Sequence, residues 1–201
     1  DSDQYQTKIQ ILENQIQKIH RNYTDIFNEH LAYLFIKLNL KDSERINMYK
    51  YDNDKFYLIG RYSTNPTLKK VRRRSYKANQ GLISKAWKES DYFLNLGVPD
   101  YGTKARERKR SHDFFNKISP IDKAIFEAIT MKSKSFYLKS LMDSKNINKT
   151  SIIVIESENT KAFVKTEIDK IIQEEEAKLN SFVDKIEWNF PKVDNAQNTG
   201  F

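Results

Sequence analysis

The residues of this chain that could do chemistry lie in the middle of its sequence, where arginine, serine and aromatic side chains follow a strand-like segment. Arg61 and Ser63 stand at the end of that segment, just before Pro66. A guanidinium group presents N–H donors in a fixed fork, so Arg61 could point into a pocket with Ser63 and bind a carboxylate or a phosphate. The alternative for Arg61 is a structural ion pair with a neighbouring strand residue such as Glu156.

Three aromatic side chains that follow could form the walls of such a pocket: Tyr76, Trp87 and Tyr101. Their rings would pack on a flat ligand and their polar tips could orient it. For Trp87 the alternative is ordinary packing in the core. His112, beside Asp113, is the histidine within this part of the chain, and it completes the set of candidate ligand contacts; a plain surface position is its alternative.

Basic residues gather in the same part of the chain. Residues 41–150 carry 25 Lys and Arg against 12 Asp and Glu. The candidate basic face consists of Lys69, Lys70, Arg72, Arg73, Arg74, Arg106, Arg108 and Arg110. A local positive field of this kind attracts a small anion, a protein partner, an acidic membrane or nucleic acid, while a solvated loop surface is the default. Without a recognition-helix or RNA-binding motif, the sequence does not favour nucleic acid.

Several chemistries are excluded or unsupported. The chain has no cysteine, so it can form no disulfide, thiolate metal site or cysteine nucleophile. Its three histidines lie in separate segments without the spacing of a metal site or a catalytic triad, and its five glycines form no phosphate-binding loop. We therefore expect no catalytic residues, no metal and no cofactor.

The sequence also bears on location. It contains no run of about 18 apolar residues and does not begin like a signal peptide. The lack of cysteine fits a reducing compartment. We expect this segment to be cytoplasmic, either free or as the cytoplasmic part of a protein that is tethered to a membrane upstream.

One long helix is predicted at the start of the chain, where residues 5–38 contain neither Gly nor Pro. Apolar residues alternate in steps of three and four at Ile9, Leu12, Ile16, Ile19, Tyr23 and Ile26. This spacing is typical of a coiled-coil seam and predicts a homodimer through residues 1–38, the alternative being a helix that folds back on its own domain. The stripe then shifts to Phe27, Leu31, Leu34 and Leu38, which suits packing on a domain.

From Glu44 the apolar period changes to two, which indicates a β-hairpin with its turn at Asp52 to Asp54. Strict alternation in the second strand puts Phe56, Leu58, Gly60 and Tyr62 on one face and Tyr57, Ile59, Arg61 and Ser63 on the other. The later elements are predicted as a short helix near 82–87, a strand at 91–97, helices at 104–117 and from Ser119, a second hairpin at 135–142 and 151–157, a helix capped by Asn159 or Thr160, and a flexible tail at 188–201.

This order of elements resembles a GAF domain, a small-molecule-sensing relative of the PAS fold. The matching pieces are Arg45-Ile46 at the first strand, GRYSTNP at the end of the second, Tyr76-x4-Gly81-x-Ile83-x3-Trp87 in the pocket segment, and IIVIES in the last strand. The resemblance covers roughly residues 30–186. It implies an α+β fold in which a five- or six-stranded antiparallel sheet is flanked by helices, with a GAF-like domain at 39–187 and a pocket roofed by residues 64–115.

The resemblance also implies a regulatory role. We expect a non-enzymatic sensor or signal-transfer module that binds a small anionic ligand and couples it to helix-mediated dimerisation. Members that hold linear tetrapyrroles covalently need a cysteine, and members that bind cyclic nucleotides carry an Asn-Lys-Phe-Asp-Glu signature; this chain has neither, so the ligand class does not transfer. The alternative is a non-catalytic interaction module whose basic face contacts a protein partner or an acidic membrane surface.

Overall fold

A computed structural model describes residues 2–187 of the chain, and the predicted tail at 188–201 lies outside this range. The strands are β1 (Glu44–Asp52), β2 (Lys55–Tyr62), β3 (Ser75–Lys77), β4 (Asp91–Leu94), β5 (Ser135–Met142) and β6 (Lys149–Ser157). The helices are α1 (Ser2–Lys37), α2 (Pro66–Lys69), α3 (Gly81–Glu89), α4 (Ala105–Ile118), α5 (Lys123–Glu127) and α6 (Lys165–Glu187).

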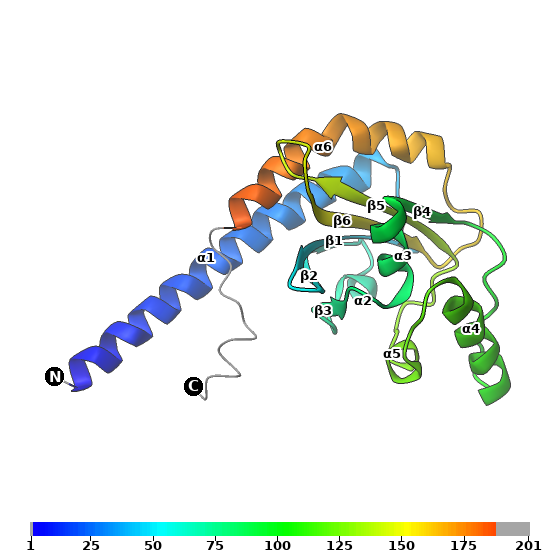
Figure 1. Cartoon of the computed structure of the whole chain (residues 1–201), viewed down its shortest axis with the longest axis horizontal. Coiled ribbons are helices and arrows are strands. Elements are labelled where there is room, and N and C mark those ends of the chain that lie inside the picture. The colour runs from blue at the N-terminus through cyan, green and yellow to red at the C-terminus, as the bar shows by residue number, and fades with distance from the viewer. Residues whose placement is uncertain (1, 188–201) are drawn as a thin grey trace.

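The strands form one six-stranded antiparallel sheet in the order β3-β2-β1-β6-β5-β4. The hairpins β1–β2 and β5–β6 meet at its centre through the β1–β6 pair, and the short strands β3 and β4 form its edges. Helices α1 and α6 lie on one face of the sheet, and α3, α4 and α5 lie on the other (Figure 1). This architecture confirms the predicted α+β class and the flanked antiparallel sheet.

The first hairpin turns where the sequence predicts. Asp52 pairs with Lys55, so the loop consists of Asn53 and Asp54 alone. Both have positive φ, 47° and 57°. Two successive residues in this conformation match the right-handed twist of the flanking strands, and Asn and Asp tolerate it better than most side chains.

A β-bulge changes the faces of β2. Met48 pairs with Gly60 and Tyr49 with Leu58, which leaves Ile59 as an extra residue. Ile59 belongs to the core beneath α1, and a side chain on Gly60 would also point at α1. The predicted alternation is therefore wrong from Gly60 onward: Arg61 lies on the face that carries Leu58, away from α1.

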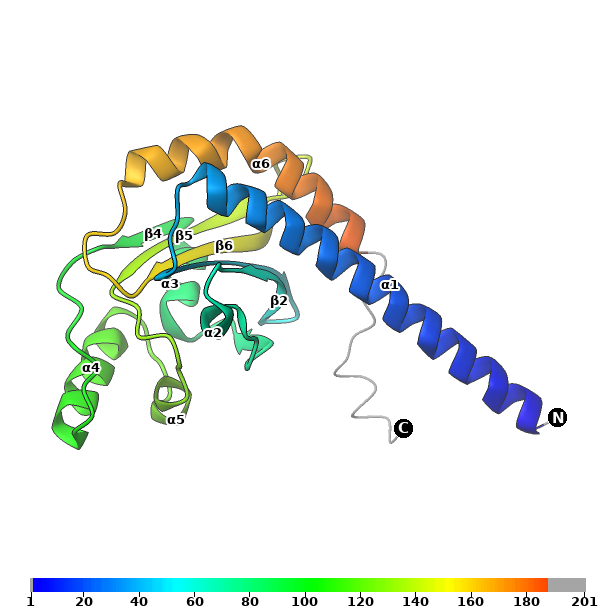
Figure 2. The same ribbon diagram turned by 180° about the vertical axis from the view of Figure 1, so that it is seen from behind.

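Helices α1 and α6 run side by side over the sheet (Figures 1 and 2). The core beneath them includes Phe27, Leu31, Leu34 and Phe35 of α1 and Ile172, Leu179 and Val183 of α6. This burial agrees with the predicted shift of the apolar stripe in the second half of α1. A separate core fills the opposite face of the sheet, under α3, α4 and α5.

Polar contacts add to the α1–α6 interface. Lys37 donates to Oε1 of Glu175 at 2.9 Å, and the buried His30 places its Nε2 3.9 Å from Oε2 of the same carboxylate. Burial lowers the pKa of His30, as does the charge of Lys178, while Glu175 opposes the shift. Phe182 packs edge-on against His30, with ring centroids 5.3 Å apart. The neutral imidazole therefore belongs to an aromatic interface.

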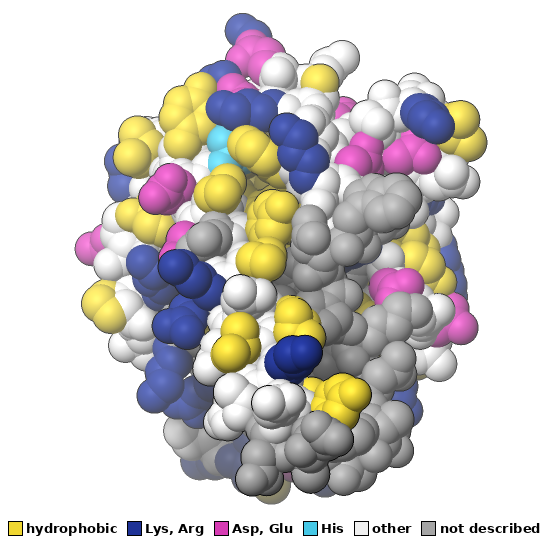
Figure 3. Space-filling view, turned by 90° about the vertical axis from the view of Figure 1, so that its left-hand side faces the viewer, with side chains coloured by type: hydrophobic (Ala, Val, Ile, Leu, Met, Phe, Trp, Pro, Cys, Tyr) yellow, Lys and Arg dark blue, Asp and Glu magenta, His cyan; other side chains and the backbone are white. Residues whose placement is uncertain are grey.

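The first half of α1 projects beyond the sheet (Figures 1 and 2). Its predicted seam is solvent-exposed, at 46% for Ile9, 56% for Leu12, 42% for Ile16 and 43% for Ile19. Figure 3, which faces the side from which α1 projects, shows hydrophobic side chains exposed down the middle of that face. Within the described residues this half does not fold back on its own domain. None of the helices described for residues 2–187 has the length and apolar character that a membrane crossing requires.

Two boundaries differ from the sequence predictions. The last helix begins at Lys165 rather than at Thr160, because Asn95 holds the preceding segment: its Nδ2 donates to the carbonyl of Phe163 at 2.8 Å and its Oδ1 accepts from the Phe163 N–H at 3.3 Å. Accordingly β4 ends at Leu94, one residue before this contact, rather than at Gly97.

The helix predicted from Ser119 also begins later. Pro120 precedes α5 instead of occupying its first turn, and its carbonyl accepts the N–H of Gly81 at 2.8 Å. This bond joins the start of α3 to the segment before α5. Gly81 has a φ of +69°, a conformation that L side chains rarely adopt, and it therefore suits the sharp entry into α3.

Gly60→Ala should destabilise the domain by about 1–3 kcal/mol, because an added Cβ would lie 2.9 Å from Leu31 Cδ1 and 3.2 Å from Phe27 Cβ. Urea unfolding measures the change. Leu31→Ala alone should cost about 2–5 kcal/mol, and the double variant should be more stable than the sum of the two effects, since each change relieves the other. Strictly additive effects would contradict the packing of α1 on Gly60.

Candidate functional site

A pocket of about 130 Å³ lies on the face of the sheet opposite α1 and α6. Its floor comes from the central strands β1 and β6 and the neighbouring β5, and its roof from β3, the start of α3, α4, α5 and the segments between them. Most of the lining is apolar, with Phe136, Leu138 and Val154 below and Ile83, Phe115 and Phe126 among the residues above. The walls can therefore hold a small apolar group.

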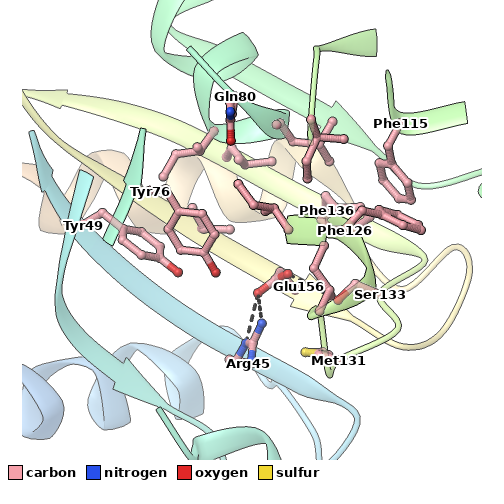
Figure 4. Close-up of a pocket in the computed structure, with 18 of the residues that line it drawn as sticks. Arg45, Tyr49, Tyr76, Gln80, Phe115, Phe126, Met131, Ser133, Phe136 and Glu156 are labelled. Atoms are coloured by element: carbon pink, nitrogen blue, oxygen red, sulfur yellow. Dashed lines mark hydrogen bonds and ion pairs between the residues drawn. The ribbon is translucent and has the colours of Figure 1, made fainter. Parts of the chain in front are cut away.

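One end of the pocket is polar (Figure 4). Arg45 of β1 faces Glu156 of β6 in register, and its Nε and Nη2 donate to Oε2 of the carboxylate at 3.0 and 2.7 Å. The side chains are 10% and 14% exposed. Burial opposes the charge on Arg45, but the attraction of Glu156 prevails and raises the pKa of the guanidinium. The guanidinium thus stays charged, and the pair is nearly removed from water.

The two oxygens of Glu156 are used unequally. Oε2 accepts from both Arg45 nitrogens and from Nδ2 of Asn47, at 3.0 Å in the last case. Oε1 receives only a long bond of 3.3 Å from Oγ of Ser133 among the described residues. Nη1 of Arg45 makes no hydrogen bond with any of residues 2–187. An acceptor, Oε1 of Glu156, and a donor, Nη1 of Arg45, therefore keep unused hydrogen-bonding capacity at the polar end.

Tyrosine hydroxyls add to this polar end. Tyr49 is 4% exposed, its ring packs edge-on against Tyr76 with centroids 5.6 Å apart, and both hydroxyls point toward the ion pair (Figure 4). Burial raises the pKa of Tyr49, so its hydroxyl stays protonated and can donate. Tyr101 donates to the carbonyl of Ser133 at 2.9 Å, and burial raises its pKa as well. These groups can orient a ligand, but they are not poised as bases.

The structure brings two of the predicted ligand contacts to the pocket, Tyr76 and Tyr101. Trp87 lies outside the lining and stacks on Tyr51 with ring centroids 4.6 Å apart, which is the core packing given as its alternative. His112 also lies outside: its Nε2 is 2.7 Å from the carbonyl of Ile121, and its ring packs on Phe126.

Arg61 and Ser63 share the pocket face of the sheet but do not line the pocket. The buried Arg61 donates from Nε to Oδ1 of Asn47 at 2.6 Å and from Nη1 to the carbonyl of Lys70 at 2.9 Å. Ser63 donates to the carbonyl of Glu44 at 2.7 Å. The ion pair with Glu156 that was the alternative for Arg61 is made by Arg45, and Arg61 reaches that carboxylate only through Asn47.

The ion pair that dominates the polar end was thus not predicted from the sequence. One signal was available: Arg45 precedes Ile46 in one predicted strand, and Glu156 follows the apolar residues Ile152 to Ile155 in another. A charge is rarely buried unless it is paired, so two opposite charges in two buried strands indicate a partnership. The register that places them opposite each other was not predictable from either strand alone.

The predicted basic face is divided in two. Residues 69–74 link α2 to β3, whereas the predicted arginines at 106, 108 and 110 lie on α4, apart from that link in both ribbon views (Figures 1 and 2). In the link, Lys69, Lys70, Arg72 and Arg74 are exposed. None of them forms an ion pair with an acid among the described residues. Arg73 is partly buried, with its guanidinium 4.7 Å from the centre of the Tyr76 ring.

Comparison with known proteins rests on structure alone, since no protein-family model and no curated protein matches the sequence. Solved structures do match. Type II free methionine-R-sulfoxide reductase from Thermoplasma acidophilum superposes with a TM-score of 0.55 over 83% of this chain and 95% of its own, at 13% identity.

Two GAF domains match with similar TM-scores. One, from an Acinetobacter phosphoenolpyruvate-protein phosphotransferase, gives a TM-score of 0.53 over 87% of this chain and 91% of its own, at 12% identity. The other, from a Bacillus halodurans sensor histidine kinase, gives 0.52 over 82% and 95%, at 12% identity. The chain therefore has a GAF-like fold, as the order of its elements suggested.

Proposed function

We propose that this chain is a regulatory module that binds a small molecule in the pocket between the sheet and helices α3 to α5. The observation that carries the proposal is the form of this pocket: an apolar cavity with one polar end, where Arg45 and Glu156 offer an unused donor and an unused acceptor. Ligand pockets have this composition, with few polar groups in a mainly apolar wall. The GAF-like fold, shared with a domain of a sensor histidine kinase, supports a sensing role.

The size of the cavity limits the ligand. An engineered apolar cavity of about 150 Å³ binds benzene, and drug-sized ligands occupy about 300–1,000 Å³. At about 130 Å³, the cavity suits a ligand whose apolar part has about six carbons. A linear tetrapyrrole is several times larger, and the chain has no cysteine that could attach one.

Binding can be transmitted because the two faces of the sheet share their strands. In β1, Arg45 and Tyr49 line the pocket, whereas Ile46 and Met48 pack beneath α1. A ligand that displaces the polar end would therefore move residues next to the core of α1 and α6. Regulation requires the ligand to bind one arrangement of these helices more tightly than another.

The proposed action is binding and not catalysis. The ionisable side chains of the pocket are one ion pair and tyrosines, and the pKa values of Tyr49 and Tyr101 are raised by burial. This set offers no nucleophile activated by a neighbouring base. The chain also lacks cysteine, so chemistry through a thiol is not available to it.

A library of small apolar and amphipathic compounds, screened by thermal shift on the whole chain, should contain members that raise the melting temperature. Leu138→Phe, which fills the floor of the pocket, should weaken their binding at least tenfold. Ile147→Phe serves as the matched control, because this residue is exposed in the β5–β6 turn. The proposal fails if no compound binds, or if binders are indifferent to Leu138→Phe.

We also propose that the projecting half of α1 forms a coiled coil with a second copy of the chain. The exposed seam supports this, since isoleucine and leucine at a and d spacing are stabilised by a partner helix. Light scattering should give twice the mass of one chain. The double change Leu12→Glu/Ile16→Glu should yield a monomer, whereas Gln15→Glu, beside the seam, should not. A monomeric parent chain at high concentration would refute this.

A second candidate function rests on the link at residues 69–74, which would contact an acidic membrane surface. Its four exposed cations without acidic partners surround Val71, which is 37% exposed. Vesicles with phosphatidylserine should bind the chain at low salt and release it near 1 M salt, where the screening length is about 3 Å. Replacing the four cations by glutamine should abolish binding, and the same changes at Arg106, Arg108 and Arg110 should not. Equal binding to neutral vesicles would contradict this role.

A further inference from the structure

We infer that the ligand of the pocket carries no net charge and presents a hydrogen-bond donor and an acceptor at one end of an apolar body. The inference rests on the proposed small-molecule function and names its ligand class. It replaces the anion that the basic sequence suggested, because neither Arg61 nor the link at residues 69–74 lines the pocket.

The charge of the pocket limits the net charge of its ligand. Arg45 and Glu156 are the charged lining residues of the pocket and form an ion pair, whereas the buried cation of Arg61 lies outside the lining and is held by Asn47 and the carbonyl of Lys70. A ligand with a net charge would bring an unbalanced charge into a site whose two ionic side chains are 10% and 14% exposed. Placing an unpaired charge in such surroundings is strongly unfavourable. A ligand without net charge avoids that cost.

The unused hydrogen-bonding groups at the polar end determine which polar groups the ligand needs. Oε2 of Glu156 is engaged by Arg45 and Asn47, but Oε1 has only the 3.3 Å bond from Ser133 and can accept another. Nη1 of Arg45 can donate, since the described residues give it no acceptor. A ligand donor therefore fits Oε1, and a ligand acceptor fits Nη1.

The tyrosines favour the acceptor side. Tyr49 is more than nine-tenths buried, its hydroxyl points toward the pair, and that of Tyr76 does so beside it (Figure 4). The structure gives these two hydroxyls no acceptor among residues 2–187. A carbonyl or carboxylate oxygen of the ligand could accept from them and from Arg45. A ligand with only acceptors would place an acceptor against the carboxylate of Glu156, which is unfavourable. A ligand with only donors would likewise place a donor against the guanidinium of Arg45.

Two chemical sources present this pattern without net charge: a neutral amide, and the zwitterion of an apolar amino acid. Four compounds on one branched skeleton separate them from ions: leucine, the neutral 4-methylpentanamide, the anion 4-methylpentanoate and the cation 3-methylbutylamine. Isothermal titration calorimetry on the whole chain should show leucine or the amide binding at least tenfold tighter than both ions. The tighter of the two identifies the source.

The inference is overturned if either ion binds as tightly as the better uncharged compound. It is also overturned if none of the four binds while library compounds do. The latter outcome leaves the proposed function standing, because that function fails only when no compound occupies the pocket.

Charge variants give the sharper test. Glu156→Gln leaves Arg45 unpaired and should reverse the order, with 4-methylpentanoate binding at least tenfold tighter than leucine. Arg45→Gln should favour 3-methylbutylamine in the same way. Circular dichroism reports whether each variant folds. A folded Glu156→Gln variant with the parent order of affinities would contradict the inference.

A double variant covers the case in which the single variants do not fold. Arg45→Gln/Glu156→Gln leaves no unpaired charge in the pocket. If leucine is the tighter ligand of the parent chain, the double variant should bind leucine at least tenfold more weakly, while its affinity for the amide changes less. If the amide is the tighter ligand, the double variant should still reject both ions. Unchanged leucine affinity in the first case, or binding of an ion in the second, would overturn the inference.

Discussion

The ion pair between the two central strands is the interaction on which both the sheet and the pocket depend. Arg45 and Glu156 occupy paired positions of β1 and β6, where the two hairpins join. Removing two charges from water costs free energy that is recovered only if their hydrogen-bonding capacity is largely met. Asn47 and Ser133 meet part of it. Both side chains line the cavity, so the groups that join the hairpins also form the polar end of the pocket.

A chain of hydrogen bonds extends from this pair to the basic link. Glu156 accepts from Asn47, Asn47 accepts from Arg61, and Arg61 donates to the backbone of Lys70. The bulge at Ile59 makes this possible, because it turns Arg61 to the face that carries Arg45 and Glu156. The pocket and the surface of the link are therefore connected by buried polar contacts and not by sequence proximity alone.

Local patterns were enough to predict most of the fold. The length of α1, the two-residue turn at Asn53 and Asp54, and the apolar strand β6 all follow from residues that are close in sequence. What could not be predicted depends on distant parts of the chain. The bulge in β2 brings Gly60 under Leu31 of α1, and the end of β4 is set by the contact of Asn95 with Phe163.

The candidate site shows the same division. Tyr76 and Tyr101 were predicted at the pocket because the resemblance placed residues 64–115 over the sheet as its roof, and both line the pocket. Arg45 and Glu156 are 111 residues apart in sequence. Only the register of β1 on β6 makes them partners, and register is a property of the folded sheet.

Because α1 is a single helix of 36 residues, about 54 Å long, a small rotation of the helix would move the end of its projecting half by a much larger distance. Its pivot lies over the sheet, where Leu31 touches the bulged strand. A tilt of about 5° at that point would displace the start of α1, about 44 Å away, by about 4 Å. A small rotation at the sheet would thus shift the start of α1 by a distance comparable to the spacing between neighbouring side chains on the helix.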